Sequence, residues 1–218
     1  MKAIKIIFLS AILGLLSLSC SRKNTEAELG AEEEFKLATE KFENKDYGKA
    51  KDGFKRIVFR YPGSKWSEDA QFKLARCYFL EKDYTTAKIE YDFFVNSYPR
   101  SRFTDDAAFE SAVCSFNESG PYYLDPSLIK KSLQEFQGFI KKYPDSERIK
   151  EAIEYAQKCI DKLAQKDMET AKLYIRVGKF TSAILYLKGL QEDYPNTSFS
   201  SEITSLLHEA ESRCEKQK

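Results

Sequence analysis

Apolar side chains recur at fixed distances before four Tyr-Pro pairs, which lie at 61–62, 98–99, 143–144 and 194–195. Fifteen, twelve, eight and five residues before the four prolines lie Tyr47, Ala50, Phe54 and Ile57; Tyr84, Ala87, Tyr91 and Phe94; Ile129, Ser132, Phe136 and Phe139; and Phe180, Ala183, Leu187 and Leu190. Because steps of three, four and three residues fall on one helical face, the pattern predicts four equivalent amphipathic helices. They span 47–60, 84–97, 127–142 and 180–193, and each is ended by its proline.

Partner helices precede these four segments. Ala38, Ala75 and Ala171 each lie twelve residues before the small residue of a predicted second helix, and tyrosines follow the last two at Tyr78 and Tyr174. A small residue, an aromatic three residues later and a short turn are typical of tetratricopeptide repeats. The expected helix pairs are 31–44 with 47–60, 66–81 with 84–97, and 104–117 with 127–142.

The segment 146–177 contains no Gly or Pro, so it is either one long helix or two helices with a joint near Lys166. Its second half pairs with 180–193, and a last helix at 198–215 closes the stack. Nine Gly and six Pro in 218 residues leave few turns, which favours helices over short strands. We therefore predict an all-α, tetratricopeptide-like helix-pair solenoid over 31–218, with four full repeats plus a C-terminal helix.

A hydroxyl side chain lies two residues after each of the four prolines. These residues are Ser64, Ser101, Ser146 and Thr197. Serine and threonine are favoured N-cap residues, so we expect each of them to cap the helix that follows.

The first twenty residues predict a lipid anchor. Lys2 and Lys5 precede an apolar run over 6–16, which has the length of a signal-peptide core, and small residues lead to Cys20. We read 1–19 as a lipoprotein signal peptide, Cys20 as the lipidation site and 20–30 as a polar tether; an ordinary secretory leader with a chance cysteine is the alternative. Serine rather than aspartate after Cys20 favours the outer membrane.

Charge argues against nucleic acid as a partner. The formal net charge is +1, and removing the two leader lysines gives 1 − 2 = −1. A nucleic-acid binder needs a strong basic surplus.

No motif indicates an enzyme, a metal site or a cofactor. His208 is the sole histidine, no CxxC pair exists, and no phosphate loop, GxSxG or HExxH occurs. Cys77, Cys114 and Cys159 each lie fifteen residues after a Tyr-Pro proline, as small core residues would; a disulfide is the alternative, and Cys214 stays ambiguous.

Binding is the function that a helix-pair solenoid favours, because its first helices line an extended concave surface. We expect Lys73, Arg76 and Glu110 to be exposed there. Tyr122, Tyr123 and Asp125 lie in an insertion at 118–126 and form a second candidate, since exposed aromatics favour interfaces; the alternative is that the loop folds back over a neighbouring repeat.

The run from Tyr47 to Phe116 includes RYPGSKWSEDAQFKLARCYFLEKDY and YDFFVNSYPRSRFTDDAAF, and LDPSLIKKSLQEFQGFIKKYPDS and LAQKDMETAKLYIRVGKFTSAILYLKGLQEDYPNTS follow. Over roughly 30–212 the chain resembles the BamD family, tetratricopeptide lipoproteins of the outer-membrane β-barrel assembly machinery. The resemblance implies a non-enzymatic scaffold, anchored in the outer membrane and facing the periplasm. It also implies that the N-terminal repeats receive unfolded outer-membrane proteins and the C-terminal repeats dock a periplasmic domain of the β-barrel insertase.

Two departures from the family pattern are visible. The family usually has five repeats, whereas this chain ends after the first helix of a fifth, and the insertion at 118–126 is short. The alternatives are another envelope tetratricopeptide lipoprotein, such as a coordinator of peptidoglycan synthesis with the Tol system, and a lipid-anchored hydrolase.

Overall fold

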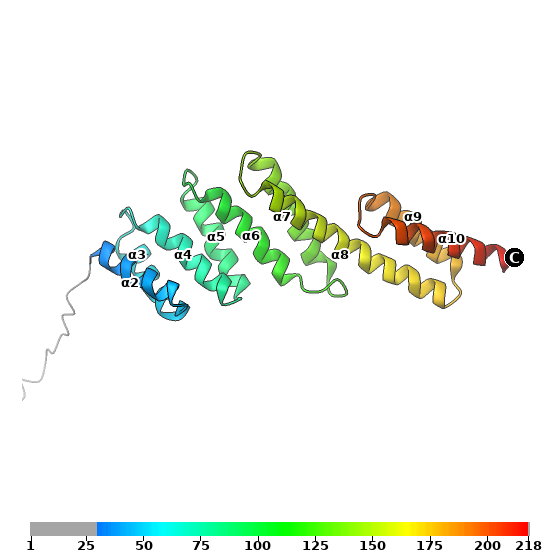
Figure 1. The fold of residues 1–218 in the computed structure, drawn as a ribbon, viewed down its shortest axis with the longest axis horizontal. Helices are drawn as coiled ribbons and strands as arrows, with labels where there is room; N and C mark the ends of the chain where they lie inside the picture. The colour runs from blue at the N-terminus through cyan, green and yellow to red at the C-terminus, as the bar shows by residue number, and fades with distance from the viewer. Residues whose placement is uncertain (1–29, 218) are drawn as a thin grey trace, which may run out of the picture. The chain divides into compact units, whose positions relative to one another are not determined.

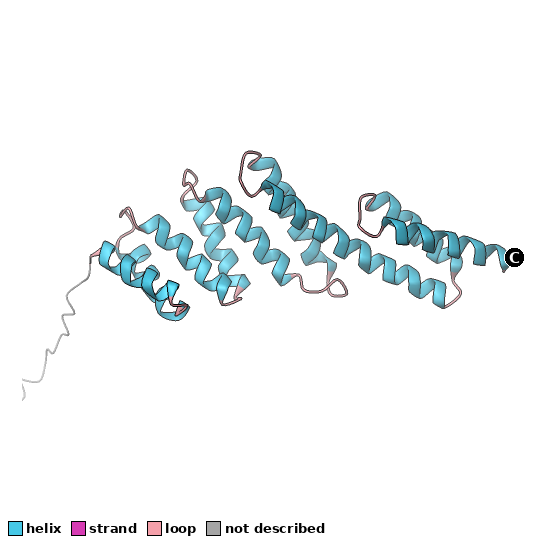
Figure 2. Ribbon diagram, in the orientation of Figure 1, coloured by secondary structure: helices cyan, strands magenta, loops and turns pink. Residues whose placement is uncertain are grey.

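The computed structural model describes residues 30–217, which form nine α-helices and no strand (Figure 1, Figure 2). In chain order they are α2 (Ala31–Glu43), α3 (Tyr47–Arg60), α4 (Ser67–Leu80), α5 (Tyr84–Ser97), α6 (Thr104–Glu118), α7 (Pro126–Lys142), α8 (Ile149–Arg176), α9 (Phe180–Asp193) and α10 (Ser200–Lys216). Successive helices pack side by side in chain order, which confirms the helix-pair solenoid. Cys20, the predicted signal peptide and most of the tether lie outside the described residues.

The predicted apolar rows form the core of the stack. Of their sixteen residues, fourteen are buried, and only Tyr47 and Tyr84 are half-buried. The second helices α3, α5 and α9 have the predicted bounds, because an N-terminal turn and the Tyr-Pro pair fix both ends. At the start of α3, for example, the Asp46 carboxylate accepts the Lys49 N–H at 3.3 Å.

The hydroxyl residues after the prolines do not occupy the N-cap positions that we predicted. The N-caps are Trp66, Phe103, Arg148 and Phe199, two residues further on. Ser146 accepts the Arg148 N–H at 3.2 Å and donates to Asp105 Oδ2 at 2.6 Å. Ser101 likewise accepts the Phe103 N–H and donates to Glu68. Because Ser101 and Ser146 lie two residues before the N-cap, each hydroxyl instead bonds the backbone that enters the helix to a carboxylate of the preceding first helix.

The segment predicted as one helix or two is the single helix α8, of 28 residues. Its first half contributes Ala152 and Cys159 to one core cluster, and its second half contributes Met168 and Ala171 to another. The helix continues without a break through Lys166, where the alternative placed a joint. The helix therefore occupies two successive first-helix positions, with no second helix between them.

The cysteines of the repeats are free thiols. Cys77, Cys114 and Cys159 are buried in the core, as their register predicts, and Cys214 is half-buried. Burial raises the pKa of Cys77 and of Cys114 to about 12, so both thiols stay protonated at neutral pH. Within 30–217, no helix is both long enough and apolar enough to cross a membrane.

The close crossing of α2 and α3 generates a first prediction. A Cβ added at Gly53 would lie 2.6 Å from the Ala38 Cβ. We expect Gly53→Ala to lower the free energy of unfolding by about 1–3 kcal/mol, because the two helices must separate. Urea unfolding followed by circular dichroism measures this change.

Gly189→Ala is the matched control, because a Cβ there meets nothing within 4 Å. It should stabilise the protein by roughly 0.5–1 kcal/mol through helix propensity alone. Equal effects of the two substitutions would contradict the proposed close packing.

Candidate functional site

A groove of about 290 Å³ lies on the side of the stack formed by the first helices α2, α4 and α6. Its walls combine three phenylalanines with two cations and one carboxylate: Phe42, Asp69, Phe72, Lys73, Arg76 and Phe103. We call it the first-helix groove. Two of the predicted binding residues, Lys73 and Arg76, are brought together here.

The aromatic floor of the groove is held by stacking between repeats. The rings of Phe72 and Phe103 are stacked, with centroids 5.0 Å apart and an interplanar angle of 18°. Phe72 also meets the buried rings of Tyr91 and Phe94 edge-on, each at 5.7 Å. Such contacts fix both rings, so the floor is a preformed apolar surface rather than a mobile one.

The same stacking recurs along the chain at one register. Phe35 stacks on Trp66 at 4.8 Å, as Phe72 does on Phe103, and the Arg148 guanidinium lies 5.1 Å from the Phe109 ring. Phe35, Phe72 and Phe109 are 37 residues apart, and each partner lies four residues after a Tyr-Pro proline. We did not single out Phe72 or Phe103 from the sequence, although this recurrence is the signal that identifies them.

The cations of the groove differ in how they are held. The Lys73 ammonium lies 4.9 Å from the Phe42 ring centroid. Arg76 lies over the Phe79 ring at 5.0 Å and donates to Glu110 Oε1 at 2.8 Å. Arg76 is therefore oriented by the protein, whereas Lys73 offers its charge at the groove wall.

Glu110 is not exposed as we predicted; it is a buried residue with 7% of its surface accessible. Besides Arg76 at 2.8 Å, it faces Arg148 at 3.8 Å. Burial raises the pKa of Glu110, while Arg76 and then Arg148 act in the opposite direction. The prediction was wrong because two arginines from other repeats let a carboxylate lie inside the stack.

Arg148 extends this ionic cluster to the start of α8. Its Nε donates to Asp106 at 2.8 Å and its terminal nitrogen donates to Glu151 at 3.0 Å. The hydrogen bond to Asp106 is the main cause that raises the pKa of Arg148. The cluster thus joins α4, α6 and α8, which are three successive first helices. Its bond from Arg76 to Glu110 fixes the position of Arg76 at the groove.

The insertion at 118–126 is fastened to α8 and lies apart from the groove. Lys162 donates to the Gly120 carbonyl and Lys166 to the Leu124 carbonyl, both at 2.7 Å. Burial lowers the pKa of Lys162. The loop is therefore held on a neighbouring helix, which is the alternative that the sequence left open.

The predicted residues of this loop have separate environments. Asp125 is the N-cap of α7 and accepts a hydrogen bond from the Ser127 N–H at 2.9 Å. A bond from the Ser127 hydroxyl, and then this backbone bond, lower the pKa of Asp125. The rings of Tyr122 and Tyr123 meet edge-on at 5.5 Å, and Tyr123 is 67% exposed. A partner-binding role for the two tyrosines stays a prediction.

The ionic cluster behind the groove generates a second prediction. Burial holds the pKa of Glu110 above its ordinary value, so ionisation of Glu110 costs the folded state free energy. The free energy of unfolding therefore falls as the pH rises from the ordinary pKa of a glutamate through the raised pKa of Glu110. Arg76→Met removes the cation that most favours the ionised form of Glu110. We therefore expect this substitution to lower the free energy of unfolding by about 1–3 kcal/mol more at pH 7.5 than at pH 5. Urea unfolding at both pH values measures it.

Lys73→Met is the control, because its ammonium lies over a ring and is not bonded to Glu110. The control should show the pH dependence of the unsubstituted protein. If both variants lose the same stability at both pH values, Arg76 does not compensate the Glu110 charge.

A protein-family model matches most of the chain. The model of the YfiO family, described as an outer membrane lipoprotein, matches residues 28–218. No curated protein matches the chain. Two solved structures are similar: a tetratricopeptide repeat protein from Parabacteroides merdae and a thermophilic TPR protein from Thermus thermophilus. The first has 12% identity and a TM-score of 0.44, over 85% of this chain and 78% of its own. The second has 14% and 0.42, over 83% of this chain and 98% of its own.

Proposed function

The chain belongs to the YfiO family of outer membrane lipoproteins, the BamD-type family, and from this premise we propose that it is a non-enzymatic scaffold of the outer-membrane β-barrel assembly machinery. Its Cys20 carries the lipid anchor, and the repeats face the periplasm. The observation that carries the proposal is the first-helix groove, a fixed aromatic floor beside two cations.

The groove suits the C-terminal signal of an unfolded barrel protein. Such a segment ends in a carboxylate, which Lys73 and the oriented Arg76 attract. An apolar or aromatic side chain next to that carboxylate would lie against Phe72 and Phe103, whose stacked rings need no reorganisation. We therefore assign substrate binding to the first three repeats.

The C-terminal repeats support docking of the insertase. Leu173, Val177, Leu185 and Tyr186 on or beside α8 and α9 are large apolar residues with 40–74% of their surface exposed. Exposed apolar surface on a soluble domain marks interaction sites. We assign to this region the contact with the periplasmic domain of the β-barrel insertase.

The lipid anchor is tested by Cys20→Ala. Because more than one acyl chain is needed for stable anchoring, loss of the acylated cysteine should move the protein from the membrane to the soluble periplasmic fraction. Immunoblots of fractionated cells measure this shift. Cys214→Ala is the matched control and should stay with the membrane. Retention of both variants in the membrane would contradict the anchor.

The substrate groove is tested with a fluorescent ten-residue peptide that corresponds to the C-terminus of an outer-membrane barrel and ends in an aromatic residue. Lys73→Glu and Phe103→Ala should each weaken binding by roughly tenfold in fluorescence anisotropy, through loss of one charge contact or one ring. Amidation of the peptide terminus should weaken binding to the unsubstituted protein similarly.

Lys131→Glu, an exposed charge reversal on α7, is the control and should leave binding unchanged. Peptide binding that is unchanged by Lys73→Glu, by Phe103→Ala and by amidation of the peptide would rule out the groove as the binding site.

Membership of the assembly machinery is tested by crosslinked purification from membranes. Recovery of Tol or peptidoglycan enzymes without the insertase would instead favour the alternative envelope function.

A further inference from the structure

The second helix of the first repeat, α3, carries a concentration of positive charge. The segment 45–66, which consists of α3 and the turns on either side of it, contains seven lysines and arginines and two aspartates, a formal charge of 7 − 2 = +5. The chain without its predicted leader has a net charge of −1, so the rest of it is acidic. Positive charge is therefore gathered on one helix and not spread over the stack.

Neighbouring elements neutralise only part of this charge. Arg56 Nε donates to Glu34 of α2 at 2.8 Å, and Lys51 pairs with Glu81, which follows α4. Subtracting these two carboxylates leaves 5 − 2 = +3. The surplus is therefore not consumed by the ion pairs that hold α3 in the stack.

Two lysines of the segment lie over aromatic rings. The Lys55 ammonium is 5.3 Å from the Tyr78 ring centroid, and the Lys65 ammonium is 4.6 Å from that of Trp66. A ring attracts a cation but carries no net charge. Both lysines therefore add to the positive field of this part of the surface.

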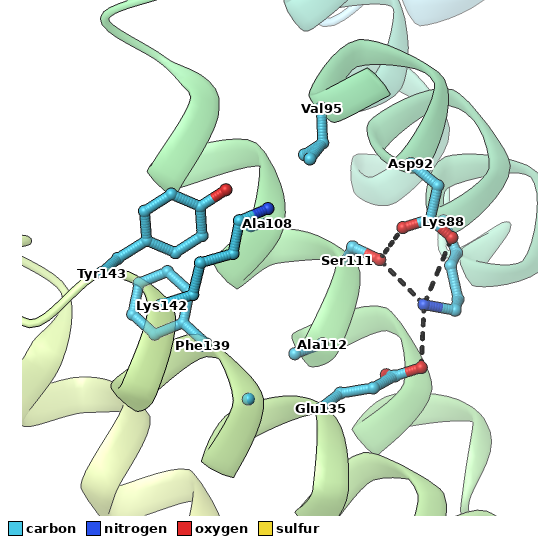
Figure 3. A pocket seen from close by; sticks show the side chains of 11 residues that line it. Lys88, Asp92, Val95, Ala108, Ser111, Ala112, Glu135, Phe139, Lys142 and Tyr143 are labelled. Atoms are coloured by element: carbon cyan, nitrogen blue, oxygen red, sulfur yellow. Dashed lines mark hydrogen bonds and ion pairs between the residues drawn. The ribbon is translucent and has the colours of Figure 1, made fainter. Parts of the chain in front are cut away.

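The pocket between α5, α6 and α7 shows the opposite case, in which charges are balanced (Figure 3). Its Lys88 ammonium donates to Ser111 Oγ at 2.8 Å and pairs with Glu135 at 3.1 Å and Asp92 at 3.4 Å. Two lysines and two carboxylates line that pocket, so it calls for no charged ligand. The surplus on α3 has no such local counterpart.

The acidic residues of α2 do not cover α3. α2 contains five glutamates and two lysines, a charge of 2 − 5 = −3. It contacts α3 at Ala38, which lies against Gly53. At 3.6 residues per turn, the exposed glutamates lie on the side of α2 opposite to this contact: Glu32, Glu33, Glu40 and Glu43. The first repeat is therefore basic on α3 and acidic on the far side of α2.

Phe59 lies among the cations on the outer face of α3. It is 79% exposed and is the one large apolar residue of α3 that is exposed. Residues three and four apart are neighbours on a helix, so Arg56 and Lys55 flank the ring. Asp52, the sole carboxylate of α3, lies on the same face. We call Lys49, Asp52, Lys55, Arg56 and Phe59 the α3 face.

A groove of about 270 Å³ between α2 and α3 opens beside the α3 face. Three cations and one carboxylate line it: Lys41, Lys49, Arg56 and Asp52. The two lysines pair only with exposed neighbours along the chain, at 3.5 and 2.9 Å, and such pairs are weak. The buried Glu34 holds Nε of Arg56, which leaves the terminal nitrogens of the guanidinium for an anion. Guanidinium groups bind phosphate oxygens in this way.

A single exposed ring among cations suits a lipid surface better than a protein. Protein interfaces are centred on several buried apolar or aromatic anchors, and α3 offers one. Helices that lie on a membrane place lysine and arginine at the headgroups and insert phenylalanine between them. The chemistry of the α3 face is therefore that of an anionic headgroup layer.

The predicted anchor brings a membrane within reach of this face. The tether 21–30 separates Cys20 from α2, and ten residues span at most about 35 Å. α3 belongs to the repeat that follows directly. The nearness of the membrane is the one step that rests on the proposed function.

We propose that the α3 face docks on anionic phospholipids, with Phe59 inserted at the level of the headgroups and phosphate oxygens accepting hydrogen bonds from Arg56 and Lys49. The opposite face of α3 packs against α2 and α4, which form the first-helix groove. A first repeat bound in this orientation keeps the groove open to a substrate.

The test uses the chain from Ser21 to Lys218, which carries no acyl group and retains the compact unit 31–218. Co-sedimentation measures its binding to an excess of vesicles. Affinity for vesicles of equal phosphatidylglycerol and phosphatidylcholine should be roughly a hundredfold higher than for phosphatidylcholine alone, because three surplus cations each contribute about fivefold. Salt at about 1 M should remove this preference, since it shortens the Debye length to about 3 Å.

Lys55→Glu and Phe59→Ala should each weaken binding to the anionic vesicles by roughly tenfold, through reversal of one charge or loss of one inserted ring. Lys131→Glu on α7 and Leu185→Ala on α9 are the matched controls, because they make similar changes at exposed sites of other helices. They should change affinity by less than about twofold, since charges beyond a Debye length are screened.

Equal binding to both kinds of vesicle, or equal losses in the α3 variants and their controls, would overturn the proposal. Binding of a capped hexaglutamate peptide without binding to vesicles would overturn it as well, because the face would then serve an acidic protein. The assay contains neither an acyl chain nor a barrel peptide. Its failure would therefore leave the anchor and the first-helix groove to their own tests.

Discussion

The burial of one row of side chains on each second helix is the constraint on which the rest of the structure depends. A helix-pair repeat contacts only its neighbours, so no distant part of the chain can compensate for a poorly packed row. Ile57, Phe94, Phe139 and Leu190 occupy the same place in four rows, and all are buried. Because these rows fix where each second helix lies, they also fix the spaces between helices. The first-helix groove is such a space, and its walls are as rigid as the rows beneath them.

First and second helices alternate along the stack except at α8. Its residues up to Leu163 pack in one core cluster, and those from Ala164 pack in the next, so the continuous helix takes the place of a turn and a second helix. Tyr194 packs against both clusters and covers the junction. The first-helix groove lies before this junction and the exposed apolar residues of α9 lie after it. The two regions are therefore linked through α8 and not through a broad interface.

Much of the fold was predictable because its signals are local. The Tyr-Pro pairs and the apolar periodicity give helix bounds to within three residues of those observed. Side chains that depend on other repeats were not predictable in this way. Glu110 is buried only because Arg76 and Arg148 come from two other first helices. Asp125 reads as a loop residue that could bind a partner, but it caps α7. Phe72 and Phe103 could have been found, since their 37-residue recurrence is present in the sequence.

The two sides of α6 use their charged side chains differently, and two consecutive residues of this helix belong to them. Glu110 bonds to Arg76, which lines the aromatic and cationic groove. On the other side of α6, Ser111 accepts a hydrogen bond from Lys88 and donates one to Asp92. The Lys88 ammonium also pairs with Asp92 and Glu135, so its three donors are used within the protein. Lys73 in the groove instead lies over the Phe42 ring, an arrangement that leaves its hydrogen-bond donors for a ligand carboxylate. A lysine is therefore structural on one side of α6 and a candidate binding group on the other.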